Sequence, residues 1–470
     1  MLELSLVLDW QNVCPYKCHC FTPLQVLCAE ERMSSFPRNI SRQVREVIIM
    51  TSSVSYLFSH SLMESPQLTR LIFLNNALRS IHLNAFELLT ELQELELSGN
   101  PPLDHLLPGT FSKQEKLTKL LLNYNSLKTV RLGMFDSLKQ LEVLQMKSNV
   151  LSDLPPFLFQ NLSSLLEILK LSNNLLSNLT CDTFHNLSHL TELHLEWNRI
   201  AHLDDGIFST LTNLSVLNLQ GNLLTSFSDK AIGSEPTNLR VLNLKGNRLT
   251  ELSFLRNLSS LTDLMLSGNQ LSSITDNLFR RLTALENLDL SDNQLTSLPE
   301  GIFKNLLSIK VINLHNNNLT EVDAKLFEDQ IFVERLYLSD NKLETLPLGL
   351  LDHFITQHIV RLHGNPWRCD CQLWYLHDWL LDNGQNVEML DMMACESPYF
   401  LRKRTVVSIP RDQLVCHLAE DQAPDLNSCS LQIANNTMII RCKVEKCSPA
   451  TVKVTNSNPA GRSVRKLWRK

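Results

Sequence analysis

The stretch LQELELSGN at residues 92–100 decides the fold of this chain, because its spacing of three leucines and one asparagine returns along most of the sequence. A second copy is LENLDLSDN at residues 285–293. Successive copies lie 24 or 25 residues apart, with one gap of 22. The asparagines that close the thirteen copies are Asn76, Asn100, Asn125, Asn149, Asn174, Asn198, Asn222, Asn247, Asn269, Asn293, Asn317, Asn341 and Asn365. A fixed period of this length predicts a solenoid with one turn of chain per repeat.

The spacing of the leucines indicates a short strand in each repeat. Leucines at positions 1, 4 and 6 are expected to point into the core, and the residues between them outward, because side chains alternate along a strand. One such strand cannot bury its apolar side alone, so neighbouring repeats must stack into a parallel sheet. The asparagines are expected to form a hydrogen-bonded ladder inside the turns, where they satisfy buried backbone groups.

Phenylalanine follows the same period on the other side of each repeat. We expect these rings to form a stacked column on the convex side of the core: Phe86, Phe111, Phe135, Phe159, Phe184, Phe208, Phe279, Phe303 and Phe327. The pattern as a whole is the signature of leucine-rich-repeat proteins. It predicts an α/β-type solenoid, a horseshoe with a parallel sheet on the concave face. The cysteine clusters on either side of the repeats resemble the disulfide-stapled caps of extracellular leucine-rich-repeat proteins, so a cap is expected at each end.

The sequence divides into five segments around this array. We interpret residues 1–13 as the remnant of a leader, 14–43 as an N-terminal cysteine cap and 44–365 as about 14 repeats. Residues 366–417 then form a C-terminal cysteine cap, and 418–470 an incomplete tail domain. A net charge of -6 argues against a nucleic-acid-binding surface. Because the chain has no stretch of 18 apolar residues, no membrane span is predicted.

Eight of the twelve cysteines bracket the repeats. They are Cys14, Cys18, Cys20 and Cys28 before the array, and Cys369, Cys371, Cys395 and Cys416 after it. Both ends of a solenoid expose a leucine core, and a small disulfide-bonded cap can shield each end. A zinc site is the alternative for such clusters, but the spacing is not that of a zinc finger. The spacing alone leaves the connectivity open. Cys181 is expected to be a buried apolar filler, with an intermolecular disulfide as the alternative.

Eight Asn-x-Ser/Thr sequons, together with the cysteine caps, favour a secreted glycoprotein. The candidate glycosylation sites are Asn39, Asn161, Asn178, Asn186, Asn213, Asn257, Asn318 and Asn435. The repeat itself places NLS and NLT in turns, so a single sequon carries little weight. The N-terminal MLELSLVLDWQN is a poor signal peptide, because it has an acidic Glu3 and lacks a basic region.

Several stretches that the repeat does not dictate resemble the non-catalytic regulatory-subunit family of plasma carboxypeptidase N. These stretches are CPYKCHCF at 14–21, LIFLNNALRSI at 71–81, LLLNYNSL at 120–127, LHGNPWRCDCQLWYL at 362–376 and ACESPYFL at 394–401. The cysteines Cys429, Cys442 and Cys447, followed by SNPAG at 457–461, add a more specific match. The resemblance covers the chain from Cys14 to about Cys447.

This resemblance implies a carrier role. The chain would bind and stabilise a secreted zinc carboxypeptidase subunit, and two such pairs would form a plasma heterotetramer. It also implies the pairs Cys14–Cys20, Cys18–Cys28, Cys369–Cys395 and Cys371–Cys416. The family's chain continues beyond the point where this one stops, which leaves one of the three tail cysteines without a partner unless Cys181 or another chain supplies it.

The candidate partner-binding residues are exposed strand positions and their neighbours: Ile72, Leu121, Tyr124, His194 and Trp197. Large apolar side chains on an open sheet tend to mark contact surfaces, although scattered exposed apolar residues are also ordinary. A second group comprises Asp263, Glu286, Asp289 and Asp292. It is either an attractive surface for a basic partner or a solvated charged face.

The sequence contains no catalytic constellation. His189, Glu192 and His194 loosely resemble the ligand spacing of zinc carboxypeptidases, but no third ligand or positioned base accompanies them. We therefore predict no enzyme activity, no metal and no cofactor. The rival hypotheses are a cell-surface or matrix adhesion ectodomain, which shares the caps and repeats, and an independent hydrolase.

Overall fold

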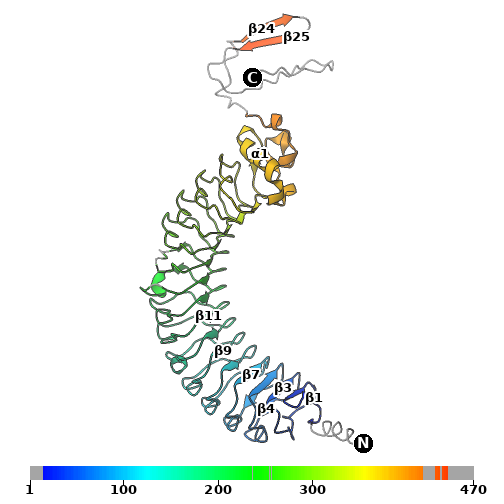
Figure 1. Ribbon diagram of the computed structural model, residues 1–470, viewed down its shortest axis with the longest axis vertical. Helices are drawn as coiled ribbons and strands as arrows, with labels where there is room; N and C mark the ends of the chain where they lie inside the picture. The colour runs from blue at the N-terminus through cyan, green and yellow to red at the C-terminus, as the bar shows by residue number, and fades with distance from the viewer. Residues whose placement is uncertain are drawn as a thin grey trace.

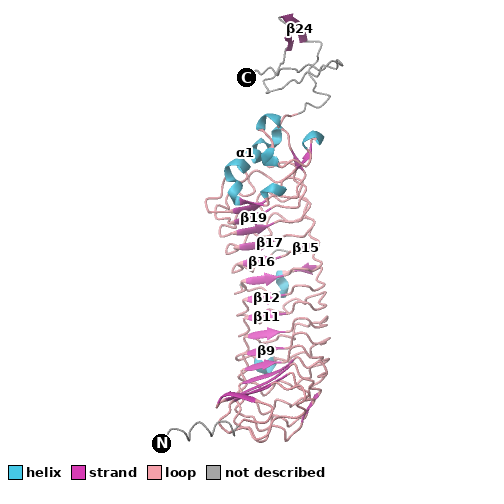
Figure 2. Ribbon diagram, turned by 90° about the vertical axis from the view of Figure 1, so that its right-hand side faces the viewer, coloured by secondary structure: helices cyan, strands magenta, loops and turns pink. Residues whose placement is uncertain are grey.

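The repeats stack into one long curved solenoid with its strands along the inner edge (Figure 1). The computed structural model describes residues 14–235, 237–252, 255, 257–416, 429–434 and 437–442. The predicted leader at 1–13, the sequon at Asn435 and Cys447 lie outside the described residues, as does most of the tail domain. Figure 2 shows the strands one above another like the rungs of a ladder.

The main sheet has 17 strands. Fourteen of them are parallel and belong to the repeats: β3 (Glu46–Met50), β5 (Arg70–Leu74), β7 (Glu94–Ser98), β8 (Lys119–Leu121), β9 (Val143–Gln145), β10 (Ile168–Lys170), β11 (Glu192–His194), β12 (Val216–Asn218), β14 (Val241–Asn243), β16 (Asp263–Met265), β17 (Asn287–Asp289), β18 (Val311–Asn313), β19 (Arg335–Tyr337) and β20 (Ile359–Arg361). The short repeat between β14 and β16 keeps the register, since Leu242 lies opposite Leu264. The predicted parallel-sheet solenoid is therefore confirmed.

The core is built from the periodic apolar residues. Leu285, Leu288 and Leu290, which are positions 1, 4 and 6 of one repeat, are fully buried. Behind them the phenylalanine rings stack on one another, with 6.1 Å between the ring centroids of Phe135 and Phe159 and 5.7 Å between those of Phe303 and Phe327. The predicted column therefore forms as separate stacks, Phe86 with Phe111, Phe135 through Phe208, and Phe303 with Phe327.

The asparagine ladder forms as expected. The Asn174 amide nitrogen donates to the backbone oxygens of Met146 at 2.9 Å and Leu171 at 3.0 Å. Its side-chain oxygen accepts from the Leu151 backbone nitrogen at 3.1 Å. The ladder asparagines from Asn125 to Asn365 repeat these bonds, whereas Asn76 bonds only to the preceding unit and the Asn100 side-chain oxygen has no partner.

The convex side consists of turns and short pieces rather than α-helices. The α part of the predicted α/β solenoid is limited, within the described residues, to α1 (Trp374–Asn383) in the C-terminal cap. After the strand and the asparagine turn, too few residues remain before the next buried position for a full helix. The convex strand pairs are β4 (Tyr56–Leu57) with β6 (Ser80–Ile81), and β13 (Ser226–Phe227) with β15 (Glu251–Leu252). The 3-10 turns are η1 (Gln160–Leu162) and η2 (Asp229–Ala231).

The caps extend the sheet at both ends. At the N-terminus β1 (His19–Thr22) pairs with β2 (Gln25–Cys28), which lies parallel to β3. At the other end β22 (Val387–Glu388) pairs with β20. The remaining elements are β21 (Trp367–Arg368), β23 (Cys395–Ser397), η3 (Cys371–Leu373), η4 (Gly384–Asn386), η5 (Leu390–Met392), η6 (Tyr399–Leu401), η7 (Val406–Ser408), η8 (Arg411–Gln413) and the pair β24 (Cys429–Ala434) with β25 (Thr437–Cys442). Both open ends of the leucine core are thereby covered.

The structure joins Cys14 to Cys20, Cys18 to Cys28, Cys369 to Cys395 and Cys371 to Cys416. These are the four pairs that the cap resemblance implies. Cys181, by contrast, is a free cysteine that is exposed, so the prediction of a buried filler is wrong. It lies in a convex turn between the buried Leu179 and Phe184, where the chain turns its small side chain outward. Over the described residues, no helix is long and apolar enough to cross a membrane.

Candidate functional site

The residue just before each ladder asparagine has a left-handed backbone, and this position shapes one edge of the concave face. The residues there are Asn75, Gly99, Tyr124, Ser148, Asn173, Trp197, Gly221, Gly246, Gly268, Asp292, Asn316, Asp340 and Gly364, all with positive φ. This conformation aims the N–H at the next repeat. The Trp197 backbone N–H, for example, donates to the Gln220 backbone oxygen at 2.8 Å. The stacking of repeats therefore imposes the backbone conformation at this position whatever side chain it carries.

Tyr124 and Trp197 are the exceptions in this column. The other positions carry glycine or small polar residues, which tolerate positive φ, whereas a bulky aromatic residue there is strained. Tyr124 has φ 54° and Trp197 has φ 58°. Both side chains are more than half exposed, at 59% and 56%. Two large aromatic side chains are thus held outward, at a local conformational cost, where the fold favours smaller residues.

The Trp197 indole rests on bare backbone. A methyl group added to Gly221 would lie only 2.4 Å from Trp197 Cε3, so the ring covers the face of that glycine. Gly246 and Gly268 continue the column, and a methyl group on Gly246 would meet only the Gly221 backbone, at 3.7 Å. Lys147 lies beside the Tyr124 ring, 6.0 Å from its centroid. Gly221 therefore provides the flat seat that fixes the direction of the Trp197 ring.

His194 lies between two carboxylates on the concave strand β11. Its Nε2 is 3.0 Å from Glu192 Oε2, and its Nδ1 is 3.7 Å from Glu196 Oε2. Partial burial alone would lower the pKa of His194, but the contacts with Glu196 and Glu192 outweigh it and raise this pKa. Burial would raise the pKa of Glu196, yet His194 and nearby hydrogen bonds lower it. The two carboxylates therefore stabilise the protonated form of His194 relative to a free histidine.

This arrangement predicts a pH-dependent contribution of His194 to stability. A raised folded-state pKa stabilises the fold fully below the ordinary histidine value of 6.5, and the contribution is lost as pH rises through the folded pKa. Because the pKa of Glu196 is lowered in the folded state, the stabilisation that its carboxylate provides is present above pH 4.5, the ordinary value of a glutamate, and is lost as the pH falls further. Substitution of His194 by glutamine should therefore lower the melting temperature more at pH 5.5 than at pH 8.5. His60, which is exposed and stacks on Phe58, is the control, and its substitution by glutamine should change the melting temperature little at either pH. An equal effect of His194→Gln at both pH values would contradict the argument.

The structure corrects two members of the predicted patch. Ile72 and Leu121 are 6% and 8% exposed, so they offer little surface to a partner. Each lies on the concave sheet between neighbouring strands, with Glu96 opposite both. Because the sheet curves toward this face, adjacent side chains close over short apolar ones. The ion pairs of Arg70 and Lys119 with Glu94 run alongside.

Two of the four acidic residues are paired with lysines within the fold, and the other two accept hydrogen bonds from asparagines. Lys245 Nζ lies 2.9 Å from Asp289 Oδ2, and Lys310 Nζ lies 2.7 Å from Glu286 Oε2. Asp263 accepts a hydrogen bond from the Asn287 side chain at 2.7 Å. Asp292 accepts one from Asn316 at 2.8 Å. These contacts favour the interpretation of a solvated charged face over that of a surface for a basic partner.

The geometry also bears on the two metal alternatives. His189 lies on the surface and contacts the Ser163 backbone oxygen at 3.0 Å, whereas His194 and Glu192 contact each other. The one cluster of metal-ligand type found among the described residues is Asp370, Cys371 and Cys416. Its two sulfurs are joined in a disulfide, so they cannot act as thiolate ligands.

The sequons lie mostly on the surface. Asn39, Asn161, Asn178, Asn186, Asn213 and Asn318 are exposed. Asn257 is half-buried and donates its side-chain N–H to the Gly233 backbone oxygen at 2.9 Å. Glycosylation stays a prediction for all of them, with Asn257 the position least open to a sugar.

Comparison with known proteins agrees with the geometry. A family model described as leucine rich repeat matches residues 102–151, 139–200, 188–249, 237–295 and 283–343. The structure of a TLR13–ssRNA13 complex is similar, with 25% identity and a TM-score of 0.70, over 79% of this chain and 54% of that one. None of the curated proteins matches the chain.

Two further solved structures share the fold. The Toll–Spatzle complex from Drosophila is 21% identical, with a TM-score of 0.64, over 86% of this chain and 59% of that one. An LRIM1/APL1C complex is 23% identical, with a TM-score of 0.63, over 80% of this chain and 67% of that one. The chain thus spans little more than half the length of the TLR13 and Toll chains that it resembles.

Proposed function

The chain belongs to the leucine-rich-repeat family, and we propose that it is an extracellular, non-catalytic subunit that binds another protein. The contact surface, here named the Trp197 surface, comprises Tyr124, His194, Glu196, Trp197 and Gly221. One observation carries the proposal: Trp197 is held outward on Gly221 with a strained backbone. Strained residues cluster at functional sites, and exposed tryptophan and tyrosine are enriched in interface hot spots.

The proposed partner is a secreted zinc carboxypeptidase, and this chain is its regulatory subunit in a complex of the carboxypeptidase N type. The support is the resemblance of the caps, of several inter-repeat stretches and of the tail cysteines to that subunit family. Binding would stabilise the enzyme by mass action, by about 2.7 kcal/mol when the carrier is present at 100 times its Kd. The Trp197 surface would supply part of the contact area.

An adhesion or receptor ectodomain is the second candidate. It is favoured by the likeness in fold to structures solved as the Toll–Spatzle and LRIM1/APL1C complexes. In this case the same surface would bind a different protein at a cell surface or in the matrix. The TLR13 structure contains RNA, but the net charge of -6 gives this chain little attraction for phosphates.

The two candidates are separated by retrieval from plasma of the source species. The secreted, tagged chain would be incubated with plasma, and the retained proteins identified and quantified by mass spectrometry. Recovery of a zinc carboxypeptidase in nearly one-to-one amount supports the carrier role. Recovery of none, repeated with a chain extended at its C-terminus, favours the ectodomain. The purified chain alone should show no peptidase activity.

Substitution of Trp197 by asparagine is expected to weaken partner binding at least tenfold, because it removes the exposed indole. The free energy of unfolding should change by no more than about 0.5 kcal/mol, since asparagine tolerates positive φ and occupies this position in other repeats. Phe332→Asn is the matched control, because Phe332 is 47% exposed but lies outside the Trp197 surface. Titration of the purified partner by calorimetry measures both variants. Equal loss of affinity in both, or in neither, would count against the Trp197 surface.

A further inference from the structure

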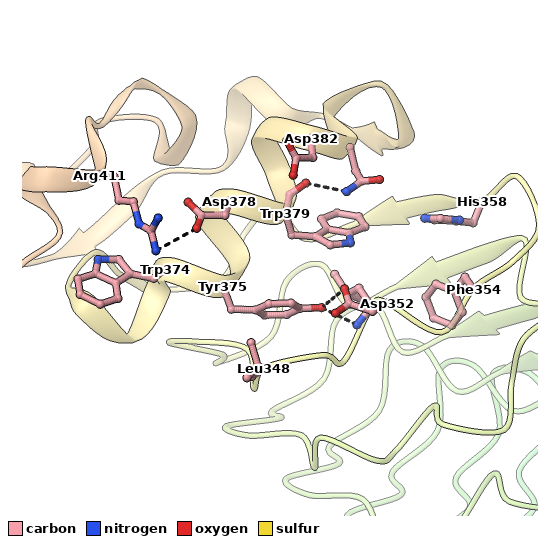
Figure 3. Close-up of a pocket in the computed structure, with 12 residues that line it drawn as sticks. Leu348, Asp352, Phe354, His358, Trp374, Tyr375, Asp378, Trp379, Asp382 and Arg411 are labelled. Carbon is pink, nitrogen blue, oxygen red and sulfur yellow. Dashed lines mark hydrogen bonds and ion pairs between the residues drawn. The ribbon is translucent and has the colours of Figure 1, made fainter.

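A pocket of about 620 Å³ opens between the last repeat and the C-terminal cap (Figure 3). Helix α1 supplies one wall with Trp374, Tyr375 and Trp379, and the convex turn of the last repeat supplies another with Asp352. The pocket is remote in sequence from the Trp197 surface and is built from different elements. Its lining mixes aromatic rings with carboxylates, a combination that suits a cation better than an apolar or anionic group.

One side of the pocket already holds a guanidinium. The Arg411 guanidinium carbon lies 5.3 Å from the centroid of a Trp374 ring, and Arg411 Nη2 lies 3.3 Å from Asp378 Oδ2. The planar cation is thus held by an aromatic face and by a carboxylate. This is a geometry in which arginine gains both cation–π attraction and an ion pair. Arg411 is therefore an example, within this pocket, of a guanidinium held between an aromatic ring and a carboxylate.

The other side has the carboxylates of Asp352 and Asp382 and the Tyr375 ring, without a lysine or arginine among the described residues that line it. Trp379 is buried there, 8% exposed and stacked on His358 with 6.3 Å between the ring centroids. Figure 3 shows the Trp379 side chain between Asp382 on one side and Asp352 on the other, with Tyr375 below. The Tyr375 hydroxyl donates to Asp352 Oδ1 at 3.0 Å and accepts from the Leu351 backbone nitrogen at 2.8 Å. That contact orients the Asp352 carboxylate and leaves its second oxygen available. Asp382 is exposed and makes no ion pair within the described part of the chain.

We propose that Asp352, Tyr375 and Asp382 bind the guanidinium of an arginine side chain presented by a partner protein, with the buried Trp379 forming the floor of the pocket. The Tyr375 ring accepts the flat face of the group, while the two carboxylates accept hydrogen bonds from its edge. Arginine fits better than lysine, because a compact ammonium cannot stack and cannot donate in two directions within one plane. The pocket thus forms a second contact site, on the cap, that does not depend on the proposed carrier role.

The test uses nuclear magnetic resonance on the full secreted chain, in which the six tryptophans are labelled with 15N. The probe is the blocked peptide acetyl-Gly-Arg-Gly-amide, and its matched control replaces arginine with citrulline, which has the same shape but no charge. We expect the arginine peptide to shift the Trp379 indole resonance, assigned with Trp379→Phe, in a saturable manner. The citrulline peptide should produce no saturable shift, and the corresponding lysine peptide should bind more weakly than the arginine peptide.

A variant pair separates local recognition from general charge attraction. The double variant Asp352→Asn/Asp382→Asn should weaken arginine-peptide binding at least tenfold with an unchanged melting temperature. Asp136→Asn/Asp205→Asn removes two exposed carboxylates elsewhere and should bind as the parent chain does. The proposal is overturned if the citrulline or lysine peptide binds as tightly, if both double variants behave alike, or if free arginine binds and the blocked peptide does not. Trp197→Asn should leave the peptide affinity unchanged, so the outcome is independent of the Trp197 surface.

Discussion

Substitution of the ladder residue Asn247 by alanine is expected to destabilise the solenoid by about 3–5 kcal/mol, because it leaves several buried backbone groups without partners. The Asn247 amide nitrogen donates to the backbone oxygens of Leu219 at 2.9 Å and Leu244 at 3.1 Å. Its oxygen accepts from the Leu224 backbone nitrogen at 3.1 Å. Asn247 is only 6% exposed, so water cannot replace these bonds without opening the repeat.

The matched control for this prediction lies in the same repeat. Asn243 is on the concave strand, half-buried, and its side-chain nitrogen donates to the Gln220 side chain at 3.1 Å. Asn243→Ala should lower the free energy of unfolding by no more than about 1 kcal/mol, because water can replace the hydrogen bonds of this half-buried side chain. Urea denaturation followed by circular dichroism measures both variants. If Asn247→Ala cost as little as Asn243→Ala, the ladder would have to be judged dispensable for stability.

Substitution of Gly221 by alanine is expected to reduce partner binding by roughly thirtyfold, about 2 kcal/mol, which is the loss typical of an interface tryptophan. The new methyl group would lie 2.4 Å from Trp197 Cε3, so the indole must leave its seat. Gly246→Ala provides a close control. It has the same place in the repeat and a positive φ of 62° against 66°, but its methyl group would meet only backbone at 3.7 Å.

The two glycine variants should lose similar stability, about 1 kcal/mol each, because both force alanine into a left-handed conformation. Only Gly221→Ala should move the Trp197 indole resonance and lower the partner affinity. The resonance can be observed without any partner, so it tests the packing even if the identity of the partner is wrong. A resonance that does not move in Gly221→Ala would show that Gly221 does not seat the indole. Equal partner affinity of the two variants would show that the Trp197 indole does not contribute to partner binding.

The period of the sequence determined the architecture by itself. A leucine at positions 1, 4 and 6 and an asparagine at position 9, as in Leu285, Leu288, Leu290 and Asn293, place each repeat directly against its own equivalent in the next one. Because each repeat contacts only its neighbours, the position of a residue within its repeat also predicts which residues of the next repeat it contacts. The sheet, the ladder and the phenylalanine stacks follow from this relation. The disulfide pairs came from resemblance, because cysteine spacing alone is compatible with several connectivities.

Only the tertiary structure decided which side chains are available. Ile72 and Trp197 are both apolar residues between ladder positions, yet the curved sheet covers one and the left-handed turn holds the other outward. The seat on Gly221 joins neighbouring repeats, and the cap pocket joins Asp352 to Tyr375 across the boundary of the array. A periodic pattern specifies which positions meet, but exposure depends on the size and direction of the side chains that adjacent repeats bring together. The sequence names Tyr124 and Trp197 as candidates by their size, and their place in the column of glycine and small polar residues before each asparagine is the signal that separates them from Ile72 and Leu121.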